Sequence, residues 1–205
     1  MDFFFALTLA LAVQHADAAE DGPARTSELD AINCRLDVPH YMQFALALDG
    51  EEKLARKRRW KAVVSRNAFI KEYELPAAIT VAGAYRTRRI GFTGNAILAI
   101  LDLPDPATIA RAERIDNAMS ADPMIAALAA TGTMTRPQAE AALPFRKFMG
   151  ERILTDVTEP AGAEDGYGSH FVVARTISNA TTHPGKTFYG CSYRLELLDK
   201  DGTAL

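Results

Sequence analysis

The sequence predicts an α+β fold: an antiparallel, meander-like sheet with a block of short helices between two strand-rich halves. Hydrophobic side chains recur with a period of two on both sides of residues 105–143, and within that range the period becomes about 3.6. The strands also come in runs rather than alternating with helices, which favours α+β over α/β. A β-sandwich or a partly closed barrel with a helical insertion is the alternative.

The first residues have the pattern of a secretory signal peptide. In residues 1–18 an apolar run from Phe3 to Val13 precedes Ala16-Asp17-Ala18, which fits the small-x-small cleavage rule, although this stretch has no Lys or Arg. The run is too short to span a bilayer. A buried N-terminal helix is the other interpretation. We therefore expect residues 19–205 to form a single domain that is periplasmic or secreted and not membrane-spanning.

The chain has two cysteines, Cys34 and Cys191, near the two ends of the expected mature protein. In an exported protein such a pair is a disulfide candidate. Two buried free thiols are the alternative. A bridge would tie the start of the domain to its last strand.

The first half of the domain is expected to consist of strands. Asn33–Asp37 is a short strand candidate, and Tyr41–Leu48 alternates apolar and less apolar residues before the Asp49-Gly50 turn. Residues 50–66 fit either a helix or a strand, and alternation around Trp60 favours the strand. Further strands are expected at Phe69–Leu75, Ala78–Ala82, Arg88–Phe92 and Ala96–Leu101. The last of these is almost wholly apolar, as in a central strand buried on both faces.

Helix signals follow in residues 105–143. Asp105-Pro106 and Asp122-Pro123 each place an N-cap residue before a proline, and Thr135 with Gln138 forms a capping box. One helical face is predicted from the spacing of Ile109, Ala112, Ile115 and Met119.

The chain then returns to strands. One is expected at Glu151–Thr158, and a closing hairpin within Gly166–Asp199 turns at Pro184-Gly185. Its second strand is predicted to bury one face, made of Tyr189, Cys191, Tyr193, Leu195 and Leu197.

Positive charge is concentrated in one region of a chain whose net charge is −3. Residues 53–89 contain eleven Lys and Arg against two acids, Glu72 and Glu74. A basic region of this kind can bind an anionic surface, an anionic ligand or an acidic protein partner. The alternative is a solvated face whose charge is balanced by acidic residues elsewhere in the chain. Nucleic acid is not expected for an exported protein with so few aromatic residues in its basic region. The candidate binding residues are Arg56, Lys57, Arg58, Arg59, Lys61, Arg86, Arg88 and Arg89.

Histidines of the closing hairpin are the weaker, catalytic candidates. His170 and His183, with Asp165 and Ser169 nearby in sequence, supply residue types used in nucleophilic hydrolysis or zinc binding. No recognised motif spacing accompanies them, so no metal and no cofactor is expected. The sequence therefore predicts an exported, non-catalytic protein that binds an envelope component, an anionic ligand or a protein partner. A small periplasmic hydrolase or metal-dependent enzyme using the His170/His183 end is the alternative.

Overall fold

The computed structural model describes residues 25–142, 148–162 and 166–205. They form one eight-stranded antiparallel sheet and six helices, which confirms the predicted α+β class. The sheet is neither split into a sandwich nor closed into a barrel. The predicted signal peptide, residues 1–18, lies outside the described residues.

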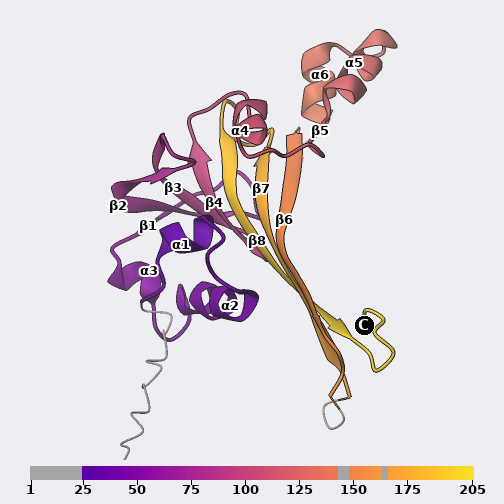
Figure 1. The fold of residues 1–205 in the computed structure, drawn as a ribbon. Coiled ribbons are helices and arrows are strands. Elements are labelled where there is room, and N and C mark those ends of the chain that lie inside the picture. The colour runs from indigo at the N-terminus through magenta and orange to yellow at the C-terminus, as the bar shows by residue number, and fades with distance from the viewer. Residues whose placement is uncertain (1–24, 143–147, 163–165) are drawn as a thin grey trace, which may run out of the picture.

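The sheet consists of two antiparallel meanders that meet at its centre, in the order β1-β2-β3-β4-β8-β7-β6-β5. After β4 the chain crosses to the far edge of the sheet and returns strand by strand until β8 pairs with β4 (Figure 1). The predicted meander is therefore correct within each half of the sheet. The two halves are joined by β4 and β8, which are far apart in the sequence. The strands are β1 Lys61–Val63, β2 Lys71–Val81, β3 Tyr85–Phe92, β4 Ala96–Leu101, β5 Met119–Ser120, β6 Phe148–Glu159, β7 Gly168–Asn179 and β8 Thr187–Leu198.

Strand β4 lies at the centre of the sheet, as its apolar sequence predicts. All six of its residues are buried, and β3 and β8 flank it. Ile97, Ala99 and Leu101 enter the main core on the inner face. Ala96, Leu98 and Ile100 belong to a second, smaller apolar cluster on the outer face, together with Ile70, Ala180 and Phe188. Alternating side chains thus serve both faces of one strand.

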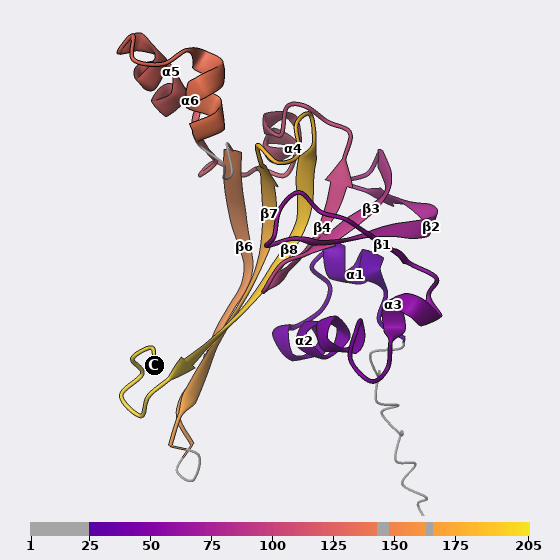
Figure 2. The same ribbon diagram turned by 180° about the vertical axis from the view of Figure 1, so that it is seen from behind.

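Three short helices cover the inner face: α1 Glu28–Ile32, α2 Val38–Ala47 and α3 Leu54–Lys57 (Figures 1 and 2). The strands predicted at Asn33–Asp37 and Tyr41–Leu48 are therefore wrong. The Asp37 carboxylate accepts a hydrogen bond from the His40 amide at 2.8 Å, and Pro39 lies in the first helical turn of α2. The side chains that α2 buries follow helical spacing, namely Val38, Tyr41, Phe44 and Ala47.

Residues 50–66 contain both of the structures between which the sequence was ambiguous. Helix α3 begins after Lys53, which has a positive φ of 49° and makes no side-chain capping hydrogen bond. Arg59, with a φ of 57°, ends this turn, and β1 follows. Trp60 between them is buried against the rings of Tyr73 and Phe92.

Strands predicted separately at Phe69–Leu75 and Ala78–Ala82 form one long strand, β2. Its register against β3 shifts between Glu74 and Ile79. Pro76 lies inside that irregular stretch. Proline has no backbone N–H, so in a regular part of the strand it would remove a hydrogen bond between β2 and β3. The proline therefore marks a bulge rather than the end of a strand.

The predicted helical block contains α4 Ala107–Ala112, α5 Asp122–Ala130 and α6 Arg136–Ala142, with the short strand β5 between α4 and α5. The Asp105 carboxylate accepts a hydrogen bond from the Ala107 amide at 3.0 Å, and the Thr135 amide donates to Gln138 Oε1 at 2.7 Å. Helices α5 and α6 contact each other at the end of the sheet (Figures 1 and 2).

The single helical face predicted through this block is only half correct. Ile109 and Ile115 are buried, whereas Ala112 and Met119 are exposed. Helix α4 ends at Ala112, and Arg114 has a positive φ of 56°, so the helical period does not continue to Met119.

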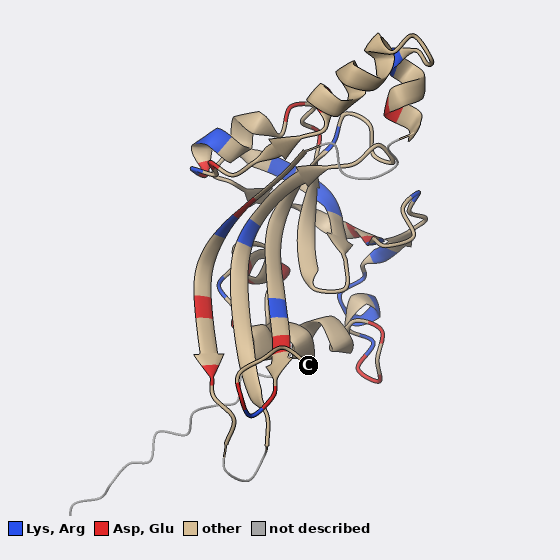
Figure 3. Cartoon of the chain, turned by 90° about the vertical axis from the view of Figure 1, so that its right-hand side faces the viewer, with Lys and Arg blue, Asp and Glu red and all other residues tan. Residues whose placement is uncertain are grey.

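Strands β7 and β8 form the closing hairpin, and its inner face carries Tyr189, Cys191 and Tyr193 into the main core. Leu195 and Leu197, predicted to share that buried face, are exposed because β6, β7 and β8 extend past the helices that cover the sheet (Figure 1). Residues of both charge signs lie along these three strands (Figure 3).

The predicted disulfide is present between Cys34 and Cys191, with 5.3 Å between their Cα atoms. It joins the segment after α1 to the middle of β8. The Tyr193 hydroxyl donates to the Ala31 carbonyl at 2.7 Å, and its ring stacks on Tyr41 with 4.1 Å between centroids. One covalent and two non-covalent contacts therefore hold the helical layer against the sheet.

We expect the double substitution C34A/C191A to lower the free energy of unfolding by about 2–5 kcal/mol, because the bridge closes a long loop in the unfolded chain. Urea unfolding of the variant and the parent, each with and without reductant, measures this. Reductant should shift the parent towards the variant and leave the variant unchanged. Equal midpoints for the oxidised parent and the variant would contradict the expectation.

Candidate anion-binding site

His170, the first catalytic candidate, lies on the outer face of β7 between two carboxylates. Its Nε2 is 2.8 Å from Asp156 Oδ1 on β6, and its Nδ1 is 3.2 Å from Glu196 Oε2 on β8. Hydrogen bonds to Asp156 and then to Glu196 raise the pKa of the His170 imidazole. Ser169 is adjacent in sequence but makes no hydrogen bond to this ring, and Asp165 lies outside the described residues.

The structure does not bring His170 and His183 into one site. His170 lies near the start of β7, and His183 lies in the loop after its end at Asn179. At about 3.3 Å per residue the intervening strand spans roughly 30 Å. Each histidine has its own carboxylates. Within the described parts of the chain, no group of three or more His, Cys, Asp or Glu side chains is placed to hold a metal ion.

His183 belongs to a polar network that joins the loop after β7 to strand β2. Its Nε2 lies 2.8 Å from Glu72 Oε1, and its Nδ1 lies 2.9 Å from the Thr182 hydroxyl. A carboxylate only accepts hydrogen bonds, so in neutral His183 the Nε2 proton is donated to Glu72 and Nδ1 accepts from Thr182. Both ring nitrogens are therefore occupied.

Glu72 is the buried carboxylate of this network, with 1% of its surface exposed. Burial by itself raises the pKa of its carboxyl, but hydrogen bonds from Ser65, His183 and Arg89 outweigh burial, and the pKa is lowered. Arg89 also forms an ion pair with Glu72. Glu72 thus stays ionised and fixes the positions of Arg89 and His183.

A pocket of about 430 Å³ opens beside this network, between β3, β4 and the loop that follows β7. Four of its side chains are cationic and only one, Asp102, is anionic, in a chain whose net charge is −3. We call it the basic pocket. It is lined by Ala78, Arg86, Thr87, Arg88, Arg89, Ile100, Asp102, His183 and Lys186.

The cations of the basic pocket are held to different degrees. Arg88 donates from Nε to the Leu75 carbonyl at 2.9 Å and lies 3.2 Å from Glu74, while Lys186 pairs with Asp102. The Nε atom of Arg89 is buried without a hydrogen-bond partner among the described residues. Arg86 forms no ion pair within the described part of the chain. Arg86 is therefore the one cation of the pocket that no ion pair among the described residues neutralises.

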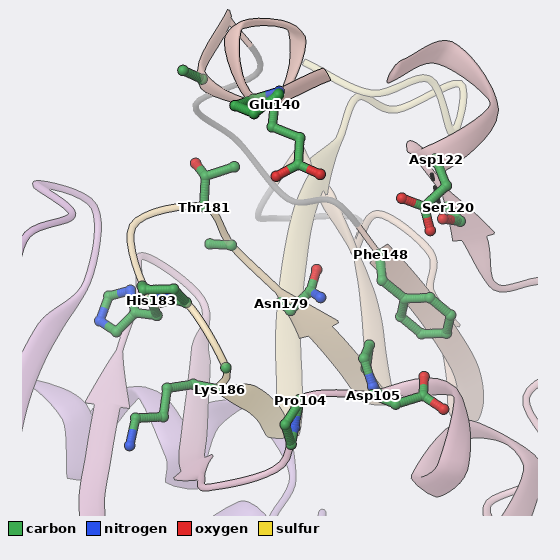
Figure 4. Close-up of a pocket in the computed structure, with 16 residues that line it drawn as sticks. Pro104, Asp105, Ser120, Asp122, Glu140, Phe148, Asn179, Thr181, His183 and Lys186 are labelled. Carbon is green, nitrogen blue, oxygen red and sulfur yellow. Dashed lines mark hydrogen bonds between the residues drawn. The ribbon is translucent and has the colours of Figure 1, made fainter. Parts of the chain in front are cut away.

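A second cavity, of about 560 Å³, shares His183 and Lys186 with the basic pocket (Figure 4). Its carboxylates come from the helical block, and each interacts with a partner in the same block. Asp105 accepts hydrogen bonds from the Ala107 amide and the Thr108 hydroxyl at the start of α4, and Asp122 lies 3.3 Å from Arg136. Glu140 also pairs with Arg136, at 3.4 Å. This cavity thus lacks the unneutralised charge that distinguishes the basic pocket.

Three of the eight predicted binding residues meet in the basic pocket: Arg86, Arg88 and Arg89. The other five lie on or beside α3 and β1, outside it. Among these, Arg58 is structural, because it pairs with Glu28 at 2.9 Å and lies over the rings of Phe44 and Trp60.

The sequence pattern missed Lys186 and the partnership of His183 with Glu72. Both depend on the pairing of β8 with β4, which places the 180–186 loop beside β2 and β3. No residue spacing in the sequence predicts that pairing.

No family model, curated protein or solved structure matches this chain. Within the described residues, no helix has the length and apolar character to span a membrane.

The pKa of His170 should be measurable by NMR titration of its imidazole and should lie above 6.5, the ordinary value. D156N should lower that pKa, since Asp156 makes the shorter hydrogen bond. The control D201N, which removes an exposed carboxylate that pairs with Lys200, should not. An unchanged pKa in D156N would contradict this account.

Replacing Glu72 with Gln should change how stability depends on pH. Because the pKa of Glu72 is lowered from 4.5 in the folded protein, its stabilising contribution is full above about pH 4.5. It is lost as the pH falls through the lower, folded-state value. The difference in unfolding free energy between the parent and E72Q, measured from pH 6 to pH 3, should therefore shrink towards acid. A difference that stays constant would refute this.

Proposed function

We propose that this chain is an exported, non-catalytic protein that binds a small anionic ligand in the basic pocket. The observation that carries the proposal is the charge balance of that pocket. Three of its four cations pair with a carboxylate, whereas Arg86 forms no ion pair within the described part of the chain. Clefts lined by charge of one sign concentrate ligands of the opposite sign. The ligand class is a compact polyanion such as a polycarboxylate or a phosphate ester.

The geometry around His183 supports binding rather than catalysis. A hydroxyl, an imidazole and a carboxylate follow one another through Thr182, His183 and Glu72, as in a hydrolase triad. Thr182, however, is absent from the residues that line either cavity beside His183. The network therefore supports a structural role for His183, as a fixed part of the pocket wall, rather than a catalytic role.

Two observations support export. The first is the signal-like pattern of residues 1–18. The second is the Cys34–Cys191 disulfide, since such bonds persist in oxidising compartments.

Isothermal titration calorimetry with citrate and with pyrophosphate tests the proposal. At least one probe should bind, and more weakly at physiological than at low salt. R86Q should weaken binding roughly tenfold, because a hydrogen bond to a charged group is lost. Because Arg86 forms no ion pair with any described residue, this variant should keep its stability.

The matched control is R56Q, which removes the same charge from α3, outside the pocket. Binding by R56Q should equal that of the parent. Failure of both probes to bind, or equal losses in R86Q and R56Q, would overturn the proposal.

A further inference from the structure

The loop between β1 and β2 exposes two large apolar side chains. Val64 is 96% exposed and Phe69 is 75% exposed. The next residue, Ile70, points the other way and is buried in the outer apolar cluster. Burial of Ile70 therefore directs Phe69 away from the protein.

Hydrogen bonds hold this loop in one shape. The Asn67 amide donates to Ser65 Oγ at 3.1 Å, and the Phe69 amide donates to Asn67 Oδ1 at 3.0 Å. The Asn67 side chain also reaches the Thr182 hydroxyl at 3.4 Å. The exposure of Val64 and Phe69 is thus a property of a braced loop.

Uncompensated positive charge flanks the two apolar residues. Residues 53–71 contain eight Lys and Arg and no acid. Three of these cations, Arg59, Lys61 and Arg66, are exposed, and within the described chain they form no ion pair. Lys71, by contrast, pairs with Asp49.

We propose that the β1–β2 loop docks this protein on an anionic lipid bilayer. Val64 and Phe69 enter the boundary between headgroups and acyl chains, and Lys61 and Arg66 contact the lipid phosphates. Apolar side chains beside cations are the combination that holds a protein at a membrane interface. A bilayer also accepts projecting side chains without a matching cavity, which an acidic protein partner would need to supply. The surface uses none of the pocket-lining residues, so it stands independently of the proposed function.

Cosedimentation of the full chain with lipid vesicles tests this surface. Binding to phosphatidylcholine vesicles containing phosphatidylglycerol should exceed binding to pure phosphatidylcholine and should weaken with salt. K61Q/R66Q should lower the partition coefficient roughly 25-fold, at about fivefold for each charge. V64S/F69S should lower it at least about tenfold, because the inserted apolar area is lost.

The matched control is M119S/M124S, which removes two exposed apolar side chains from β5 and α5. Its partitioning should equal that of the parent. In a separate F69W variant, tryptophan emission should shift to the blue on anionic vesicles, whereas Trp60 is buried in both states.

Three results would overturn the proposal: no binding to anionic vesicles, unchanged binding by V64S/F69S, or binding to polyglutamate with no binding to vesicles. Failure of the pocket is distinguishable from failure of the loop. R86Q should retain vesicle binding, and V64S/F69S should retain binding of citrate or pyrophosphate.

Discussion

The attachment of the N-terminal helices to β8 is the constraint on which the rest of the structure depends. Besides the disulfide and the Tyr193 hydrogen bond, Arg175 on β7 donates to the carbonyls of Ile32 and Gly190. Arg175 is 5% exposed, and its Cζ atom lies 4.3 Å from the centre of the Tyr189 ring. A buried cation stabilises a fold only where such partners replace water. Here those partners come from α1 and β8, and Arg175 itself lies on β7.

This attachment assigns different roles to the two faces of the sheet. The inner face is covered by helices and carries most of the core. The outer face keeps only a small apolar cluster, beside which the β1–β2 loop and the 180–186 loop meet through Asn67 and Thr182. The basic pocket and the proposed lipid-docking loop both lie among these outer connections. A rigid scaffold with ligand-facing loops is the usual division of labour in proteins.

The elements predicted correctly are those whose signals are local. The six apolar residues of β4, the capping residues at Asp105 and Thr135, and the cysteine pairing all appear in the structure. Helix α2 was missed because Met42, Phe44, Leu46 and Leu48 alternate, yet Met42 and Leu46 are exposed and the buried residues follow a period near 3.6. The basic pocket was found only in part, since Arg86 to Arg89 share a strand whereas Lys186 arrives from a distant loop.

The pairing of β4 with β8 has a consequence for how the protein forms. Ala96 lies opposite Ser192 and Leu101 opposite Thr187, so the two halves of the sheet stay separate until the last strand is available. Contacts between residues so far apart in sequence slow folding, because a large loop must close before they form. Until then, β4 lacks the neighbour that buries its apolar edge. A growing chain with this topology therefore cannot complete its sheet, or form the Cys34–Cys191 disulfide, until β8 has been synthesised.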